Sequence, residues 1–391
     1  MTAVYQASID PFLSGSFYYM ELYPLPGNIQ PEMKCLQRPG RRHYLLAPMV
    51  KMTPLSSTIG QKFIPQETMG EGIMRVGFIG LGNVGGKLAG SLVRNGFSVM
   101  VRDLDRAIAE PFIQDGADWG DSPGAMAEAC ELIITCLPSP AACAAVMEGE
   151  DGILDGIGPG KIWAEMSTTD EGEVKRLGAM VAEKGADAVD CPVSGGCHRA
   201  ATGNISIFAG CERAVFDRML PVLTTLGRRV LHTGPLGSAS ILKVMTNYLA
   251  TANLMTCAEA LVTMKAAGMD LNTTFEAIRI SSGNSFVHET ESQIILNGSR
   301  NINFTMDLVL KDIGLFQSIA ENNNIPLEIS PLMVETFRHA IEQYGPREFS
   351  PNIIRLLEDK TGLDIRAPGF PAEILDDEPE EKGYEVVPVR G

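Results

Sequence analysis

The sequence predicts an α/β protein in which a parallel-sheet domain over residues 74–236 is joined by a long helix to an all-α domain over residues 237–364. After Arg75, short runs of β-branched and apolar residues alternate with helical stretches, a pattern typical of a parallel α/β sheet. After Gly237, a stretch of about 30 residues contains neither Gly nor Pro, which indicates one long helix and then further helices.

Each element follows from a local pattern. A helix is expected at 87–95, after the first strand, and breaks between later helices are expected at Pro326, Pro331 and Pro346. The expected strands are residues 76–79, 98–102, 132–136, 162–165, 186–190, 205–209 and 229–232.

The two ends of the chain differ from this middle part. Residues 1–73 show no sustained helical or strand period and no signal-peptide apolar core, so we expect an irregular extension. A disordered arm or an upstream extension from a misassigned start codon is favoured over a transit peptide. We therefore expect a cytoplasmic protein, with organellar targeting left open. Residues 365–391 are dominated by Pro, Gly, Asp and Glu, which predicts an acidic, disordered tail.

Composition argues against several classes of function. The net charge of −16 and the lack of Lys/Arg clusters make nucleic acid an unexpected partner. The most apolar stretch, residues 238–269, carries Lys243, Asn247, Glu259 and Lys265, so no membrane span is expected. Five histidines and eight scattered cysteines form no ligand pattern, so no metal site is expected. The cysteines are Cys35, Cys130, Cys136, Cys143, Cys191, Cys197, Cys211 and Cys257.

A glycine motif follows the first expected strand and precedes the expected helix. In a Gly-x-Gly-x-x-Gly pattern, Gly80 permits a tight turn, Gly82 lets the backbone approach a pyrophosphate, and Gly85 allows close helix packing. This context predicts a Rossmann-type dinucleotide site, whereas the bare motif would be weak. The expected cofactor-binding residues of the motif are Gly80, Leu81, Gly82, Asn83, Val84 and Gly85.

Asp103 closes the second expected strand, about 20 residues beyond the motif, where a carboxylate can accept both ribose hydroxyls. This favours NAD over NADP. Arg102 is the reason to keep NADP open, because a guanidinium there could bind a 2′-phosphate. As its neighbour in a strand, Arg102 should point to the opposite face from Asp103.

Six blocks in order make residues 75–361 resemble the β-hydroxyacid dehydrogenase family, whose members include 3-hydroxyisobutyrate dehydrogenase and tartronate semialdehyde reductase. The blocks are residues 77–85, 135–138, 166–169, 190–196, 234–247 and 304–312. Taken together they are highly specific, although no later block alone would be.

The resemblance implies that Lys243 exchanges the proton of the substrate hydroxyl and that Asn247 holds both the lysine and the substrate. The two residues lie four apart and so share a helix face. Hydride loss from a carbinol carbon requires removal of the hydroxyl proton, and a partly desolvated lysine can accept it near neutral pH. A lone lysine on such a helix is usually a surface charge; the surrounding pattern reverses that interpretation. His288 is the one rival acid or base, against the simpler interpretation of a helical histidine at a domain contact.

The resemblance also assigns the remaining site residues. Ser194, Gly195 and Gly196 would bind the substrate carboxylate, since successive backbone N–H groups can form a nest for an anion. Cys191 stands where members of the family usually have alanine. His198 and Arg199 come soon after the turn, at positions where discrimination between substrates can arise. Thr168 would lie near both substrate and nicotinamide. Further cofactor contacts are expected from Leu137, Pro138, Phe304, Lys311 and Asp312.

The leading hypothesis is reversible hydride transfer between NAD and a small β-hydroxyacid carrying a carboxylate, such as 3-hydroxyisobutyrate. The Thr202-Gly203-Asn204 pattern places this substrate slightly ahead of tartronate semialdehyde (2-hydroxy-3-oxopropionate). The acidic chain lacks the basic residues expected for phosphogluconate-type decarboxylation, and imine reductases lack the lysine. A non-catalytic cofactor-binding regulator is the other alternative, which the retention of Lys243 and Asn247 opposes. The long helix predicts a homodimer or homotetramer.

Overall fold

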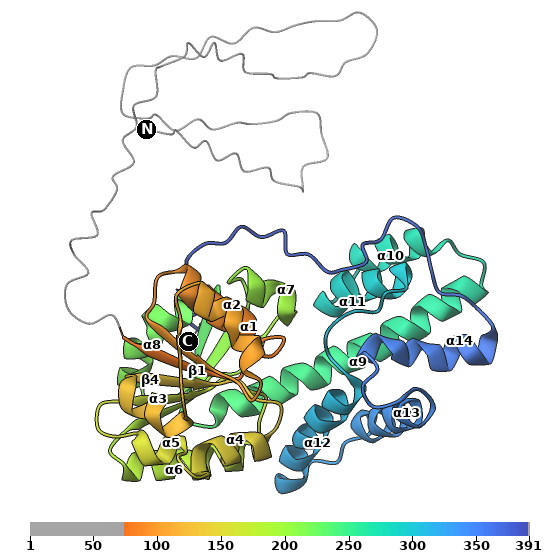
Figure 1. Cartoon of the computed structure of the whole chain (residues 1–391). Helices are drawn as coiled ribbons and strands as arrows, with labels where there is room; N and C mark the ends of the chain where they lie inside the picture. The colour runs from red at the N-terminus through yellow and green to blue at the C-terminus, as the bar shows by residue number, and fades with distance from the viewer. Residues whose placement is uncertain (1–73, 390–391) are drawn as a thin grey trace, which may run out of the picture. The chain divides into compact units, whose positions relative to one another are not determined.

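The computed structural model describes residues 74–389, so the expected extension over residues 1–73 lies outside the described residues. Within that range the chain forms a mostly parallel sheet flanked by helices, followed by a helical region (Figure 1). The predicted fold class is therefore confirmed.

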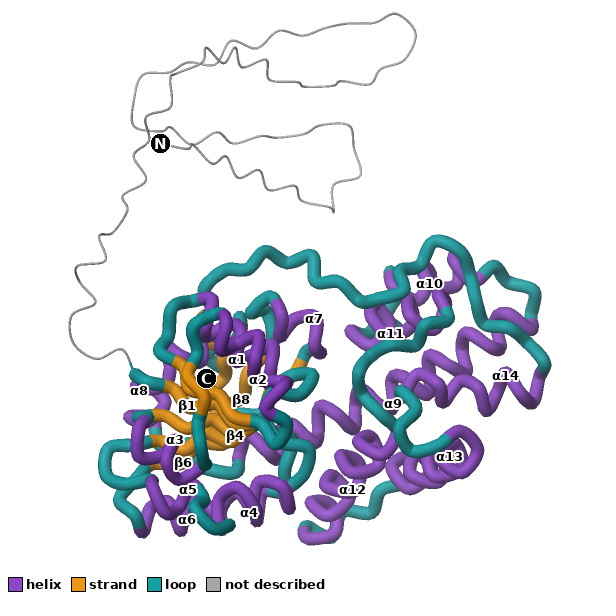
Figure 2. Tube along the Cα trace, viewed as in Figure 1, coloured by secondary structure: helices purple, strands orange, loops and turns teal. Residues whose placement is uncertain are grey.

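The described residues contribute ten strands to one sheet, coloured orange in Figure 2. Their order is β10-β9-β8-β6-β5-β4-β1-β2-β3, with β7 paired to β8. The strands are β1 (Val76–Ile79), β2 (Val99–Arg102), β3 (Asp118–Trp119), β4 (Leu132–Thr135), β5 (Ile162–Glu165), β6 (Asp187–Asp190), β7 (Val193–Ser194), β8 (Ser206–Gly210), β9 (Arg229–Gly234) and β10 (Tyr384–Glu385).

All seven expected strands are present, with ends shifted by two residues at most. The sheet is not wholly parallel, because β8 runs antiparallel to β6 and to β7. The two-residue strands β3, β7 and β10 were not predicted. Such short strands are held by pairing with a neighbour more than by their own residue preferences.

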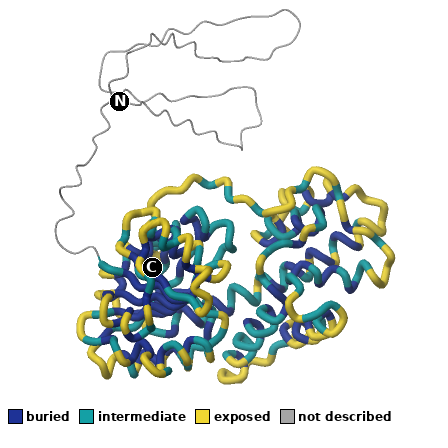
Figure 3. Tube along the Cα trace, viewed as in Figure 1, coloured by how far each residue is buried: buried dark blue, intermediate teal, exposed yellow. Residues whose placement is uncertain are grey.

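Helices surround the sheet. The expected helix at 87–95 is observed as α1 (Gly85–Arg94). The other helices of this domain are α2 (Arg106–Gln114), α3 (Pro123–Ala129), α4 (Pro140–Glu148), α5 (Ile153–Gly156), α6 (Glu171–Glu183), α7 (Gly196–Ala201) and α8 (Arg213–Leu226). The central strands β1, β4 and β5 are buried along their whole length (Figure 3), as expected for strands covered on both faces.

The helical region begins with α9 (Ser238–Ala266), the predicted long helix. It continues through α10 (Leu271–Arg279), α11 (Phe286–Asn297), α12 (Met306–Asn322), α13 (Ile329–Tyr344), the 3-10 helix η2 (Ser350–Ile354) and α14 (Arg355–Thr361). Pro331 does not break a helix, contrary to expectation, because it lies in the first turn of α13, where its missing N–H costs no hydrogen bond. Leu261, Phe337 and Ile354 lie fully buried in the core shared by these helices.

The prediction of a disordered tail over residues 365–391 is wrong for the residues that the structure describes. Ile365 is fully buried in the helical core. Farther along, β10 adds a parallel strand to the edge of the sheet beside β9. The acidic residues that suggested disorder are paired with arginines of the sheet domain, as described below. No helix within residues 74–389 is both long and apolar enough to cross a membrane.

Candidate active site

The register of the sheet aligns the ends of five neighbouring strands. Ile79 of β1 pairs with Arg102 of β2 and with Thr135 of β4. Thr135 in turn pairs with Glu165 of β5, and Glu165 pairs with Asp190 of β6. The loops after these strands therefore leave the sheet along one edge. From β1 the chain adds β2 and β3 on one side, and from β4 it adds β5 and β6 on the other side. The position between the ends of β1 and β4 is therefore a topological switch point, where α/β sheets bind ligands.

The glycine loop, residues 80–85, lies at this switch point. Gly80 has a φ of +98°, and a Cβ there would lie 2.3 Å from the Cys136 carbonyl oxygen. A Cβ on Gly85 would lie 2.1 Å from the Gly80 carbonyl oxygen. A Cβ on Gly82, in contrast, would meet no protein atom within 4 Å. The loop is thus tight against β4 and α1 and open at Gly82, as a pyrophosphate-binding turn requires.

Asp103 and Arg102 point to different partners, as the strand alternation predicts. The Asp103 carboxylate accepts a hydrogen bond from the Leu81 backbone N–H at 2.7 Å, so it lies beside the glycine loop. The Arg102 guanidinium instead donates to the carbonyl oxygens of Gly120 and Asp121, at 2.7 and 2.6 Å. The carboxylate therefore lies at the glycine loop, and the guanidinium is bonded elsewhere.

Glu165, which was not predicted as a site residue, supports two loops of the cofactor side. It is fully buried at the end of β5 and accepts a hydrogen bond from the Ser167 N–H at 2.7 Å. The Ser167 hydroxyl accepts one from the Leu137 N–H at 2.7 Å, so the loop carrying Leu137 and Pro138 is tied to Glu165. Burial raises the pKa of the Glu165 carboxyl, and the hydrogen bonds that it receives oppose that shift. A carboxylate ending an apolar strand was the sequence signal for this residue.

Asp190 fixes the start of α9. Its buried carboxylate accepts hydrogen bonds from the backbone N–H groups of Gly237 and Ser240, at 2.8 and 2.7 Å, and from the Ser240 hydroxyl at 2.9 Å. A carboxylate at a helix N-terminus satisfies free N–H groups and is favoured by the helix dipole. The edge of the sheet therefore sets the position of Lys243, which follows Ser240 within the next turn of α9.

Four residues, which we call the lysine cluster, join α9 to α12: Lys243, Asn247, Lys311 and Asp312. The Lys243 Nζ donates to Asn247 Oδ1 at 2.8 Å, and the Asn247 amide donates to Asp312 Oδ2 at 2.6 Å. Lys243 is only 7% exposed and Asp312 only 2%. Burial lowers the pKa of Lys243 to about 8; the Asp312 carboxylate opposes this shift, and Lys311 adds to it.

Lys311 links the cluster to the sheet domain. Its Nζ pairs with Asp312 Oδ1 at 2.8 Å and donates to the Thr168 carbonyl oxygen at 2.7 Å. The Thr168 carbonyl thus lies beside the cluster. Phe304 packs against the helical core, and its carbonyl accepts from the Ser350 N–H. These contacts do not place Phe304 at the glycine loop or at Lys243.

Ser194, Gly195 and Gly196 form the turn that joins β7 to α7, in which Ser194 ends the strand and Gly196 begins the helix. Gly195 and Gly196 have φ values of +132° and +86°, conformations that disfavour a side chain. No side chain caps the first turn of α7. Free backbone N–H groups in such a turn are able to bind a carboxylate. Cys191, which precedes the turn, is fully buried.

The rival His288 is a structural residue. Its ring is fully buried, with Nε2 at 2.9 Å from the Phe275 carbonyl oxygen and Nδ1 at 3.1 Å from the Ser292 hydroxyl. Both ring nitrogens are therefore engaged inside the helical domain. Burial lowers the pKa of this histidine.

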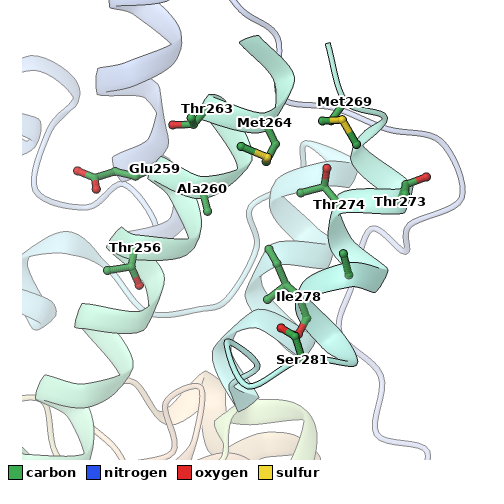
Figure 4. Close-up of a pocket in the computed structure, with 11 residues that line it drawn as sticks. Thr256, Glu259, Ala260, Thr263, Met264, Met269, Thr273, Thr274, Ile278 and Ser281 are labelled. Carbon is green, nitrogen blue, oxygen red and sulfur yellow. The ribbon is translucent and has the colours of Figure 1, made fainter. Parts of the chain in front are cut away.

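A surface groove of about 530 Å³ opens between α9 and α10 (Figure 4). Its lining residues lie between Thr256 and Ser281, and they include none of the candidate site residues. Thr256 lies 13 residues after Lys243, a rise of about 20 Å along the helix. We therefore take the lysine cluster, and not this groove, as the candidate active site. Among residues 74–389, no group of three or more His, Cys, Asp or Glu could hold a metal ion.

A phosphate-binding loop at the switch point of an α/β sheet, bonded through neighbouring loops to a buried lysine on an adjoining helical domain, defines a nicotinamide-dependent dehydrogenase. Models of known protein families match both the sheet domain and the helical domain. The NAD-binding domain of 6-phosphogluconate dehydrogenase matches residues 75–234, and the NAD-binding domain of NADP-dependent 3-hydroxyisobutyrate dehydrogenase matches residues 237–357.

Individual relatives identify the family. The chain is 32% identical to 2-(hydroxymethyl)glutarate dehydrogenase of Eubacterium barkeri, over 75% of this chain and 97% of that one. It is 30% identical to mitochondrial 3-hydroxyisobutyrate dehydrogenase of Rattus norvegicus, over 73% and 88%. The crystal structure of 3-hydroxyisobutyrate dehydrogenase from Salmonella typhimurium aligns with a TM-score of 0.66 at 25% identity, over 72% and 99%. The protein belongs to the β-hydroxyacid dehydrogenase family of NAD(P)-dependent oxidoreductases.

Proposed function

We propose that the protein catalyses reversible hydride transfer between NAD and a small β-hydroxyacid of the 3-hydroxyisobutyrate type, with Lys243 as general acid and base. The observation that carries this proposal is the buried Lys243 ammonium, whose pKa is lowered to about 8 and which is held by Asn247. An acid–base group is most effective when its pKa lies near the working pH.

In the oxidative direction, neutral Lys243 accepts the hydroxyl proton of the substrate while the hydride leaves the same carbinol carbon. Bound NAD supplies the hydride acceptor. In the reductive direction, the ammonium returns the proton to the carbonyl oxygen. An ammonium has three N–H groups, and within residues 74–389 Asn247 accepts one of them, which leaves donors for the substrate oxygen. Asn247 is oriented in turn by Asp312.

The substrate carboxylate is assigned to Ser194 and the backbone N–H groups of Gly195 and Gly196. Positive φ values at both glycines support this assignment, because they are typical of backbone nests that bind anions. Thr168, whose carbonyl is bonded to Lys311, is assigned a place between substrate and nicotinamide.

The fit of the chain to a dinucleotide rests on the open position at Gly82 and on Asp103 beside the glycine loop. The bonds of Arg102 to two carbonyl groups support NAD over NADP, since they hold the guanidinium away from a 2′-phosphate. Gly80, Leu81, Gly82, Asn83, Val84 and Gly85, together with Leu137 and Pro138, are the residues proposed to hold the cofactor.

The substrate assignment rests on relatives named 3-hydroxyisobutyrate dehydrogenase. The Thr202-Gly203-Asn204 pattern gives it less support than the sequence suggested. The side chains of Thr202 and Asn204 bond to Asp376 in the C-terminal segment. Tartronate semialdehyde therefore remains in the panel of substrates to be tested.

We further propose that the enzyme acts in the cytoplasm as a homodimer or homotetramer. Leu249, on α9, is 50% exposed and is a position at which a subunit contact can be tested by substitution. Light scattering of the purified protein measures the number of subunits.

The proposal is tested with Lys243→Ala and the matched control Lys265→Ala, an exposed lysine on the same helix. Turnover is followed through reduced cofactor, with 3-hydroxyisobutyrate, 2-(hydroxymethyl)glutarate, serine and tartronate semialdehyde as substrates. We expect Lys243→Ala to lower turnover about a hundredfold or more, the usual effect of losing a general acid or base, with NAD affinity nearly unchanged. Lys265→Ala should behave as wild type.

Near wild-type turnover by Lys243→Ala would show that the lysine is not the acid–base group. A wild-type protein that binds NAD but turns over none of the panel would favour a non-catalytic regulator.

A further inference from the structure

Residues 376–385, which we call the strap, run along the sheet domain after leaving the helical domain. The segment before it is fixed to the helical domain: the Asn297 amide donates to the Phe370 carbonyl at 2.8 Å, and the Ser299 hydroxyl donates to the Ala372 carbonyl at 2.6 Å. Only three residues separate Ala372 from Asp376. Figure 1 shows this part of the chain in dark blue. Hydrogen bonds thus fix the chain to the helical domain at Phe370 and Ala372, just before the strap begins.

The carboxylates of the strap pair with arginines from four parts of the sheet domain. Each of these pairs has at least one exposed side chain, and such pairs contribute little to stability. The pairs are Glu378 with Arg199 and Arg229, Glu380 with Arg94, Glu381 with Arg228, and Glu385 with Arg213.

Asp376 differs from the other strap carboxylates because its side chain is only 3% exposed. It accepts hydrogen bonds from the Thr202 hydroxyl and from the Asn204 amide, the latter at 2.8 Å. Arg199 Nε lies 4.0 Å from its other oxygen. Burial alone would raise the pKa of Asp376. The hydrogen bonds from Thr202 and Asn204 act in the opposite direction, and the net shift of the pKa is downward.

These contacts converge on α7 and the loop after it. Arg199 belongs to α7, Thr202 ends it, and Asn204 follows. The fully buried Asn204 amide also donates to the Glu378 carbonyl at 2.8 Å, and the Arg199 guanidinium donates to the Glu378 carboxylate at 3.1 Å. The strap therefore holds the C-terminal end of this helix.

A second contact holds α7 from the helical domain. The Arg199 guanidinium lies 4.8 Å from the ring centre of Phe286, the first residue of α11, and the His198 ring stacks on the same phenylalanine. A helix of six residues without a side-chain cap is too short to be stable alone. Its position depends on these neighbours.

We propose that Asp376 and Glu378 are positioning residues for the substrate: through Arg199, Thr202 and Asn204 they fix α7, and with it the Ser194–Gly196 turn assigned to the substrate carboxylate. This role rests on the proposed function of that turn. The family models end at residue 357, so the strap lies beyond the residues that they match.

The proposal predicts which constants change. Within residues 74–389 the strap forms no hydrogen bond or ion pair with the glycine loop or the lysine cluster. Releasing α7 should therefore weaken substrate binding and leave NAD binding and the proton transfer unchanged. KM for the carboxylate substrate is expected to rise, with kcat nearly constant.

The experiment compares Asp376→Asn/Glu378→Gln with Glu381→Gln/Glu385→Gln in the full chain. Each double variant removes two carboxylates from the strap, but the second pair bonds to Arg228 and Arg213 instead of α7. We expect the first variant to raise KM about tenfold, corresponding to about 1.4 kcal/mol, and the second to leave KM within about twofold. Amide hydrogen exchange of residues 197–202 should accelerate in the first variant alone.

Glu378→Gln alone is the milder variant should the double change impair folding, because this side chain is 38% exposed. It should raise KM in the same direction by a smaller factor. Unchanged KM and unchanged exchange of residues 197–202 in both Asp376→Asn/Glu378→Gln and Glu378→Gln would overturn the proposal. If the wild-type protein turns over no hydroxyacid, the proposed function fails, and the exchange measurement still decides whether the strap holds α7.

Discussion

The glycine loop of the sheet domain and the lysine cluster of the helical domain, the two sides of the candidate active site, are built by different means. In the glycine loop, backbone atoms approach so closely that added Cβ atoms at Gly80 and Gly85 would lie 2.3 and 2.1 Å from carbonyl oxygens. In the lysine cluster, burial lowers the pKa of Lys243 to about 8, and the charges of Asp312 and Lys311 shift it in opposite directions. The first side should therefore be sensitive to volume and the second to charge.

Adding one methyl group to the glycine loop should have the largest effect. We expect Gly80→Ala to weaken NAD binding at least about a hundredfold, or about 2.7 kcal/mol, because the loop must move away from Cys136. Backbone strain at φ +98° should also lower Tm by roughly 5–10 °C. Calorimetric titration with NAD and thermal melting measure the two effects.

Gly82→Ala is the matched change, since the same methyl group would meet no protein atom within 4 Å. It should leave Tm nearly unchanged and still weaken NAD binding, because the new side chain occupies the space assigned to the pyrophosphate. Equal loss of Tm in both variants would contradict the distinction between a tight and an open glycine.

Changing charge in the lysine cluster should shift the pH dependence of turnover. In the oxidative direction Lys243 must be neutral, so wild-type kcat should rise as pH increases through about 8. Asp312→Asn removes the carboxylate that raises the pKa of Lys243, so this rise should occur at lower pH. We expect turnover itself to fall about tenfold, since Asn247 is held less firmly.

Lys311→Gln is the opposite test, because Lys311 lowers the pKa of Lys243. The rise of kcat should move to higher pH. Shifts of the two profiles in the same direction would show that the charges of the cluster do not control Lys243.

Asp103 should produce the smallest effect of the three sites, because its proposed role is limited to hydrogen bonds with the ribose of the cofactor. Asp103→Asn keeps a hydrogen-bonding side chain but removes the repulsion of a 2′-phosphate. We expect NAD affinity to fall about fivefold, near 1 kcal/mol, and NADP affinity to fall less or to rise. A wild-type enzyme that already prefers NADP would refute this role.

The sequence predicted the sheet domain well because its long strands are continuous apolar runs, as in β4 with Leu132 to Thr135. It did not predict β3, β7 or β10, each of two residues, since so short a run shows no alternation of its own and is defined by pairing with a neighbouring strand. The disorder predicted for the tail was wrong for a related reason. Local composition of an acidic segment carries no information about arginines such as Arg199 and Arg213 that pair with it.

The glycine motif and the family resemblance identified the candidate site residues in the sequence. Only the three-dimensional contacts show what holds these residues in place. Lys243 and Asn247 were predicted to share a helix face, and they are hydrogen-bonded. The bond from Lys311 to the Thr168 carbonyl joins residues 143 apart in the chain, which no local pattern reveals. Glu165 and Asp190 were visible as carboxylates at strand ends, but their partners depend on the register of the sheet.

Strand β10 has a consequence for the behaviour of the protein in concentrated solution. Without it, β9 would be the last strand of the sheet and would present unpaired backbone groups along a six-residue edge. Such an edge is a template for pairing with another molecule. β10 covers part of it, and Pro388, which lacks an N–H group, follows soon after. β10 and the proline after it are therefore expected to limit aggregation through the sheet edge.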